Sequence, residues 1–377
     1  MLGLLAPLLV WRLGSLLPGI NHNEAATLQL AHQNLHYFLT HPGHAPYLLL
    51  VKLALLLPVR GIVAARVVAV FFGVLTLAAV YWLIRYWQGR RAALFSTLLF
   101  GSSAWFLHAA RLGSPDVLLC GAVWLVGIGV WLKHTNWPGV AILLLAAAAI
   151  LMYEPGMVWI IAAGLVWQWR TLDKAFKKYP SAVIGGGLAF VVLLAPLGWG
   201  LYKQGELWRT LLLLPAHGWP QPLAVVKAAA WAPLHLFVRG PQLPGEWLGH
   251  VPLLSTLVSA LIFLGGYAHL KHFALRRSWV LLALIVVAMG LVGLGGAPYL
   301  SVALPFMYVV AAAGVALLLD RWQQVFPRNK IAKTVGLGLV SIAVGASCYF
   351  GIRAYFVAWP HAPETRGAYS SAAKLAR

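Results

Sequence analysis

The sequence predicts an all-α polytopic membrane protein with about 11 transmembrane helices, and with juxtamembrane helices on the outer face in the first external loop. Of its 377 residues, 61% are hydrophobic and only 10% are charged, which is too little charge for the solvated surface of a soluble protein of this size. The mean hydropathy is +0.82. Apolar runs of roughly 15–24 residues alternate with short basic or Pro/Gly-rich stretches, as transmembrane helices alternate with loops.

The formal net charge of +20 has a simple explanation in such a protein. Many Lys and Arg residues stand in short stretches between apolar runs, where they orient the chain and meet anionic lipid. We therefore expect the lipid bilayer as a partner and no nucleic acid. The two cysteines, Cys120 and Cys348, both lie inside apolar runs, so a disulfide framework is not expected.

Basic clusters predict the orientation of the chain, because Lys and Arg concentrate in cytoplasmic loops. The spans must then alternate between these clusters. The first run shows no cleavage site of small residues and is expected to remain as the first span. The clusters are Arg85 with Arg90 and Arg91, Arg170 with Lys174, Lys177 and Lys178, Lys271 with Arg276 and Arg277, and Arg321 with Arg328, Lys330 and Lys333.

The first span is expected at residues 2–17 and the second at residues 62–84. Between them, residues 46–58 hold only about a dozen apolar positions, a length typical of an interfacial helix rather than a span. Residues 24–39 also have the pattern of a surface helix. The remaining spans are expected at 92–109, 117–132, 139–152, 156–169, 181–201, 251–270, 279–294, 299–319 and 334–350.

This pattern predicts one transmembrane domain over residues 1–352, followed by a short external tail over residues 353–377. The first external loop is expected at residues 18–61. A larger one, with several prolines and one amphipathic helix near residues 223–238, is expected at residues 202–250.

The carboxylates are the next informative feature, because the chain holds only eight Asp and Glu residues. The topology leaves Asp173 and Asp320 among cytoplasmic basic residues, whereas Glu24, Asp116 and Glu154 stand at tight outer junctions between apolar runs. A carboxylate at membrane depth is costly unless it is paired or used. A shared outer-face site and a set of unrelated interfacial acids both fit this pattern.

Each of these acids also has a structural interpretation. Glu24 and Glu154 suit the first turn of a helix, where the helix dipole favours negative charge. Asp116 follows Ser114 and Pro115, which together signal a helix start. Arg111 suits a membrane-interface anchor as well as a phosphate ligand.

Histidines in the first external loop suggest a metal site as one alternative. His32 and His36 are four residues apart, so on one helix they would share a face and could ligate a divalent ion with Glu24, His41 or His44. The sequence holds no complete zinc pattern. No cofactor is therefore predicted with certainty, and a divalent metal ion stays open.

Several segments together resemble a known family. Residues 17–25 (Leu-Pro-Gly-Ile-Asn-His-Asn-Glu-Ala) resemble the first external loop of the glycosyltransferase C superfold, in its protein O-mannosyltransferase and aminoarabinose-transferase branch, where an Asp-Glu pair follows the first helix. Residues 41–46 (His-Pro-Gly-His-Ala-Pro) are similar to its His-Pro-Pro-Leu segment. Residues 66–116 follow its order of span, Gly-Arg-Arg turn, span and Ala-Arg segment with a downstream acid. Residues 299–305 resemble its late Tyr-Leu-x-Pro-x-Leu-Pro helix, and residues 355–359 the start of its external tail.

The resemblance implies an enzyme that moves a sugar from a polyprenyl-phosphate donor to a lipid, glycan or protein acceptor on the non-cytoplasmic face. It implies a bacterial inner membrane, with the site facing the periplasm or exterior. The first-loop acid and a second external acid, here Glu24 and Asp116, would act as general base or stabilise the transferring centre. Basic residues would hold the carrier phosphate.

Two departures from the family bear on activity. Asn23 replaces the family's leading Asp, and an amide cannot take up a proton as a general base. Ala297 and Pro298 stand before Tyr299, where relatives often carry an arginine. The candidate substrate- and phosphate-binding residues are Asn23, Lys52, Arg60, Arg111, Glu154 and Tyr299.

The Asn23 departure keeps an alternative open, a non-catalytic lipid-carrier binding or transport protein on the same fold. An unrelated secondary transporter would instead show internal repeats and broken helices near the bilayer midplane.

Overall fold

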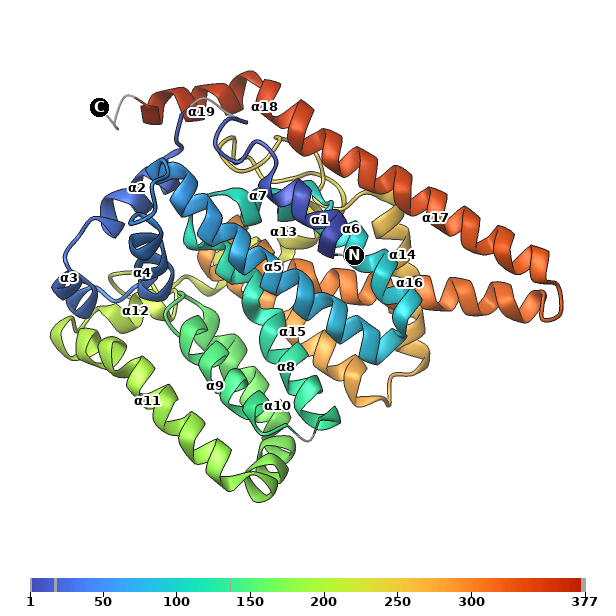
Figure 1. The fold of residues 1–377 in the computed structure, drawn as a ribbon, viewed down its shortest axis with the longest axis horizontal. Helices are drawn as coiled ribbons and strands as arrows, with labels where there is room; N and C mark the ends of the chain where they lie inside the picture. Colours follow the sequence, from blue (N-terminus) through green and yellow to red (C-terminus); the bar gives the residue numbers. More distant parts are fainter. Residues whose placement is uncertain (1, 17–18, 136, 374–377) are drawn as a thin grey trace.

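A computed structural model describes residues 2–16, 19–135 and 137–373, and in this part of the chain all regular structure is helical (Figure 1). Both long helices and short connecting helices are present. In chain order they are α1 (Leu2–Val10), α2 (His22–Ala31), α3 (Leu35–Thr40), α4 (Ala45–Ala54), α5 (Gly61–Gln88), α6 (Arg90–Gly101), α7 (Ala104–Arg111), η1 (Pro115–Gly121), α8 (Ala122–His134), α9 (Gly139–Leu151), α10 (Met157–Lys178), α11 (Pro180–Lys203), α12 (Leu207–Leu211), α13 (Pro222–Phe237), α14 (Thr256–Lys271), α15 (Arg276–Gly295), η2 (Ala297–Tyr299), α16 (Leu300–Val325), α17 (Lys330–Arg353), η3 (Ala354–Ala358), α18 (Trp359–His361) and α19 (Pro363–Ala373).

Within the described residues, six helical segments are long and apolar enough to cross a membrane, or seven if the bent pair α6–α7 counts as one span. The chain is therefore an integral membrane protein. Shorter apolar helices, among them α4, α9, α13 and α14, fall below this length. The expected total of about 11 spans, and the expected outer-face position of the first-loop helices, stay predictions. The segments are α5, η1 with α8, α11, α15, η2 with α16, and α17 through α18.

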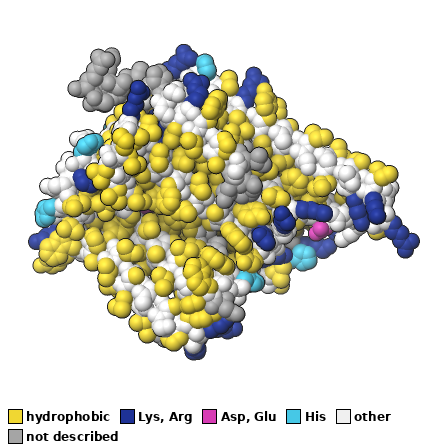
Figure 2. Space-filling view, in the orientation of Figure 1, with side chains coloured by type: hydrophobic (Ala, Val, Ile, Leu, Met, Phe, Trp, Pro, Cys, Tyr) yellow, Lys and Arg dark blue, Asp and Glu magenta, His cyan; other side chains and the backbone are white. Residues whose placement is uncertain are grey.

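Helix α16 is the centre of the bundle. Of its apolar window 83% is buried, against 11% for the last segment, Lys330–His361. Gly265 of α14 and Gly314 of α16 let these two helices approach closely, because a Cβ on either would meet the backbone of the other. Helix α17 runs along one edge of the molecule and leaves many of its large apolar side chains exposed (Figures 1 and 2).

The expected span at residues 92–109 is wrong as a single helix. Helices α6 and α7 meet at 67°. Ser102 donates its hydroxyl to the Leu98 carbonyl, and the Ser103 hydroxyl accepts from the Phe106 amide to begin α7. Serine side chains compete in this way with the helical backbone for hydrogen bonds.

The expected surface helix at residues 24–39 is also two helices, α2 and α3. Asn34 accepts from the amide of Tyr37 and begins the second one. His32 follows the last residue of α2 and His36 lies in α3, so the two histidines do not share a helical face. The first expected span, at residues 2–17, begins as α1 and turns after Val10, with Arg12 at a φ of 53°.

The helix expected near residues 223–238 is present as α13 and packs along α15, but it is not amphipathic, because its exposed residues are mostly apolar. Gly293 of α15 permits this approach, because a Cβ there would lie 2.7 Å from the carbonyl of Val225. The residues that α13 exposes include Leu223, Val226 and Trp231, all of them apolar.

Candidate functional site

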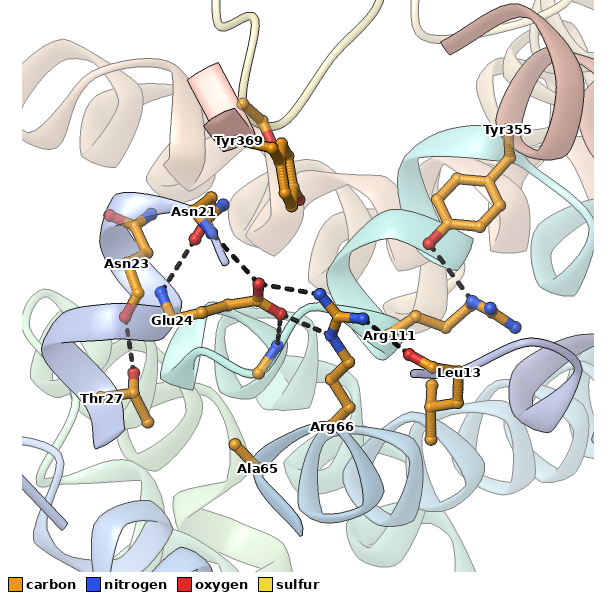
Figure 3. A network of polar contacts seen from close by, with 12 residues as sticks. Leu13, Asn21, Asn23, Glu24, Thr27, Ala65, Arg66, Arg111, Tyr355 and Tyr369 are labelled. Atoms are coloured by element: carbon orange, nitrogen blue, oxygen red, sulfur yellow. Dashed lines mark hydrogen bonds and ion pairs between the residues drawn. The ribbon is translucent and has the colours of Figure 1, made fainter. Parts of the chain in front are cut away.

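Glu24 is fully buried and holds an ion pair with Arg66 of α5 (Figure 3). Arg66 Nε donates to Glu24 Oε1 at 2.7 Å, and a terminal guanidinium nitrogen donates to Oε2 at 2.9 Å. The amides of Gly113 and Asn21 also donate to this carboxylate, at 3.0 and 3.3 Å. Both oxygens are thus bound by strong, charge-assisted donors.

The start of α2 explains how Glu24 reaches this position. The Asn21 side chain accepts from the Glu24 amide at 2.8 Å, and Glu24 returns the bond to the Asn21 amide, which completes a capping box. The carboxylate therefore joins α2, α5 and the turn after α7. A catalytic role for Glu24 stays a prediction, and its geometry is that of a residue that positions its neighbours.

Arg111 is likewise held in place by several hydrogen bonds. Its guanidinium donates to the carbonyls of Leu8 and Trp11 and to the hydroxyl of Tyr355, and it lies over the rings of Tyr355 and Phe356. It thus fastens the end of α1 to η3 near the end of the chain.

The other two expected phosphate ligands differ from each other. Lys52 Nζ donates to the carbonyls of Ala31 and Gln33, at 3.2 and 2.6 Å, and so caps the end of α2. Arg60 precedes α5 with an exposed side chain, for which the described residues show no hydrogen-bond partner.

Asn23 lies beside Glu24 in the sequence but contacts a different part of the chain. Its amide nitrogen donates to Glu246 Oε1 at 2.8 Å, across 223 residues of sequence. Glu246 comes from the segment between α13 and α14. Burial and the charge of Asp116 raise the pKa of Glu246 to about 7, although the hydrogen bond from Asn23 acts to lower it. Sequence reasoning placed Glu246 only in an external loop and did not include it in the site.

Asp116 stands at the start of η1, partly exposed, and its Oδ2 accepts from Ser114 Oγ at 2.7 Å. Its charge raises the pKa of Glu246 and also that of His44. Asp116 therefore lies within electrostatic reach of both groups. The three side chains come from different elements: Asp116 from η1, Glu246 from the α13–α14 segment and His44 from the start of α4.

His44 and Glu154 form the third part of this region. His44 Nδ1 lies 2.6 Å from Glu154 Oε2, and Glu154 is buried. Burial lowers the pKa of His44, but the charge and hydrogen bond of Glu154, with the charge of Asp116, outweigh it and raise the pKa above 6.5. Tyr299 donates to the carbonyl of Pro155, next to Glu154, at 3.2 Å.

The described residues hold no group of three or more His, Cys, Asp and Glu side chains that could bind a metal ion. His32 Nδ1 lies 2.7 Å from the Leu28 carbonyl of the preceding helix α2, and His36 is exposed on α3. The expected metal candidates are thus not brought together.

An apolar groove of about 530 Å³ lies between α14, α17 and the α6–α7 bend. A small cavity of about 20 Å³ adjoins it and is lined by Glu246 and His108. Trp247 lines both. The groove therefore leads along apolar side chains to the residue next to Glu246.

Helix α19 contacts the segment between α13 and α14 that carries Glu246. The Tyr369 hydroxyl donates to the Gly245 carbonyl at 3.4 Å, next to Glu246, and the Tyr369 ring stands over the Glu24–Arg66 pair (Figure 3).

No protein-family model and no curated protein matches this sequence. Solved structures do match its fold. ArnT from Cupriavidus metallidurans in the apo state aligns with a TM-score of 0.58 and 13% identity, covering 98% of this chain and 75% of ArnT. The same protein bound to undecaprenyl phosphate aligns with a TM-score of 0.57 and 12% identity, covering 99% of this chain and 75% of ArnT.

The oligosaccharyltransferase AglB from Archaeoglobus fulgidus, in complex with an inhibitory peptide and a dolichol-phosphate, aligns with a TM-score of 0.58 and 16% identity. This match covers 94% of this chain but only 55% of AglB. This chain has the glycosyltransferase C fold. The resemblance found in the sequence is thereby confirmed.

The glycosyltransferase C fold brings some of the expected site residues together and keeps others apart. Asn23, Asp116 and Glu154 lie in one region with Glu246 and His44. By contrast, Glu24 and Arg111 are held in buried bonds, and Lys52 closes a helix end.

Proposed function

We propose that this protein is a membrane glycosyltransferase. It moves a sugar from a polyprenyl-phosphate donor to a lipid, glycan or protein acceptor on the non-cytoplasmic face of a bacterial inner membrane. The observation that carries the proposal is the bond from Asn23 to Glu246, which holds a carboxylate within electrostatic reach of Asp116.

Glu246 and Asp116 supply the acid–base chemistry in this proposal. The acceptor hydroxyl attacks the anomeric carbon of the sugar as the bond from that carbon to the phosphate oxygen breaks. The hydroxyl proton passes to a carboxylate, and the bonding electrons stay on the departing phosphate. A base works best when its pKa is near the working pH, and the pKa of Glu246 is raised to about 7.

Asn23 then has a defined task. Asn23 stands where the family that this sequence resembles has an aspartate. It donates a hydrogen bond to the carboxylate of Glu246, in the segment between α13 and α14. Glu246 supplies the carboxylate that Asn23 lacks, and Glu24 acts as a positioning residue through Arg66.

The donor fits the surroundings of these carboxylates. The apolar groove beside Trp247 suits an isoprenoid chain, since its lining is largely apolar and includes Phe350 of α17. Arg60, with its exposed guanidinium, is the proposed contact for the carrier phosphate, whereas Lys52 and Arg111 have structural bonds.

The test is turnover in lipid nanodiscs with a panel of polyprenyl-phosphate sugars and membrane extract as acceptor. Mass spectrometry follows release of the free carrier phosphate. We expect release by the wild type and a loss of at least about 100-fold in Glu246→Gln and Asp116→Asn. Asp173→Asn, in a surface pair with Lys177, is the matched control and should keep full activity.

A second function is favoured by Asn23 itself, because an amide cannot replace a catalytic acid in its own position. This is the binding or transport of the lipid carrier without transfer. Carrier that stays bound to the wild type with no release under any donor would establish this second function and refute the first.

A further inference from the structure

Another pocket lies near the far end of α5 from the Glu24–Arg66 pair. It has a volume of about 270 Å³ and lies between the start of α6, the end of α16 and the start of α17. The described residues that line it include Arg91, Leu319, Trp322, Gln323, Lys333 and Thr334.

Helix geometry separates this pocket from the proposed active site. Arg66 lies near the beginning of α5, and that helix continues to Gln88, just before Arg91. At 1.5 Å per residue this path spans roughly 30 Å. The pocket is therefore independent of the transfer reaction proposed above.

Hydrogen bonds between α16 and α17 fix one wall of the pocket. Trp322 Nε1 donates to the Ala332 carbonyl at 2.7 Å and so ties the end of α16 to the start of α17. Gly336 permits this contact, because a Cβ there would lie 2.3 Å from Trp322 Nε1. Asn329 accepts from the Ala332 amide at 3.0 Å and caps α17. These bonds fix the helix turn that carries Lys333.

The lining of the pocket is basic. Arg91 from α6 and Lys333 from α17 both line it, and none of its lining residues is acidic. Asp320 follows the lining residue Leu319, but its side chain is exposed and is not part of the lining. In the described part of the chain, neither cation has an ion pair or a side-chain hydrogen bond. Two cations held at one hollow repel each other unless an anion lies between them.

The lining also has an apolar side, made by Leu319, Leu337 and the ring of Trp322. Lys and Arg gather at this end of the molecule, around the turn from α16 to α17 (Figure 2). Cations beside apolar side chains at the end of a helical bundle suit a phosphate group at a membrane surface.

We propose that this pocket binds a phosphate ester group between Arg91 and Lys333. A phospholipid headgroup and a soluble phosphate compound share this chemistry, and the experiment distinguishes them. Gln323 offers an amide donor, and Leu319 and Leu337 would contact the first carbons of a lipid.

The experiment is native mass spectrometry of the purified full chain, taken from nanodiscs of phosphatidylcholine with increasing phosphatidylglycerol or cardiolipin. The wild type is compared with Arg91→Ala/Lys333→Ala and with Arg328→Ala, a basic residue of the same turn outside the pocket lining. We expect the double variant to need about 10-fold more anionic lipid for the same occupancy, and the control to match the wild type.

A second arm titrates inorganic phosphate into the detergent-solubilised protein and follows thermal unfolding. Phosphate that stabilises the wild type but not the double variant, without a difference in lipid occupancy, would assign the pocket to a soluble phosphate. Equal lipid occupancy and equal phosphate response in wild type and double variant would overturn the proposal, as would an equal loss in Arg328→Ala. Thermal unfolding in phosphatidylcholine alone should be unchanged, which excludes a folding defect.

Discussion

Asn23 and Glu24 are neighbours in the sequence, yet they belong to two different environments. Glu24 is enclosed by Arg66 and backbone amides, whereas Asn23 reaches Glu246 in a partly buried region next to Asp116. Successive residues of an α-helix point about 100° apart, so adjacent side chains meet different partners. The comparison teaches that the acid in a recognised motif and the acid available for chemistry can be different residues.

The largest effect should come from breaking the buried ion pair. Glu24→Ala leaves the Arg66 guanidinium without its partner and should lower the free energy of unfolding by about 3–5 kcal/mol. Thermal unfolding in detergent measures this loss. Glu24→Ala/Arg66→Met should recover part of it, because no buried charge is left unpaired. A Glu24→Ala protein of unchanged stability would contradict this prediction, because the buried ion pair would then contribute nothing to folding.

Asn23→Ala tests the contact between Asn23 and Glu246. It removes a hydrogen bond that lowers the pKa of Glu246, so that pKa should rise above about 7. The acidic limb of the pH–activity profile should move to higher pH, and activity near pH 7 should fall about 10-fold. The profile of carrier-phosphate release against pH measures both effects. Asn34→Ala, at the cap of α3, is a control that should leave the profile in place.

Asp116→Asn should move the same limb in the opposite direction. The charge of Asp116 raises the pKa of Glu246, and its removal should lower that pKa. The residual activity of the variant, normalised to its own maximum, should therefore extend to lower pH than in the wild type. A limb that stays in place would separate Asp116 from Glu246 and contradict the proposed carboxylate pair.

The smallest effect concerns stability at the His44–Glu154 contact. The pKa of His44 is raised above 6.5 in the folded protein, so protonated His44 contributes stability that is fully present below pH 6.5. This contribution is lost as the pH rises through the folded-state pKa. His44→Asn should flatten the dependence of thermal unfolding on pH in this range, with a change of about 1 kcal/mol. Identical pH dependence in both proteins would refute this linkage.

The fold could be predicted because hydropathy and basic turns are local properties of the sequence. Helices α5 and α11 match the expected spans closely. The break between α6 and α7 was missed, since the hydroxyls of Ser102 and Ser103 change the backbone within an apolar run. The break between α2 and α3 was missed for a similar reason, because Asn34 caps a new helix.

The site was harder to predict than the fold. Asp116 could be singled out by its place between apolar runs, and Asn23 by its position in the motif that resembles the family's first external loop. The contact between Asn23 and Glu246 joins segments 223 residues apart, and no local pattern indicates such a pair. The same holds for Glu24, whose partner Arg66 lies 42 residues away on a transmembrane helix.

The bonds of Arg111 have a consequence for biosynthesis. Its guanidinium joins the carbonyls of Leu8 and Trp11, at the end of α1, to the hydroxyl of Tyr355 in η3, so an early and a late helix of the described chain meet on one side chain. During translation Arg111 enters the membrane long before Tyr355 leaves the ribosome. Until the segment that carries Tyr355 is in place, Arg111 lacks this hydroxyl as a hydrogen-bond partner, and the region around the carboxylates lacks the cover of α19. The enzyme proposed here would thus become competent only after the segment that carries Tyr355 and α19 has joined the earlier helices.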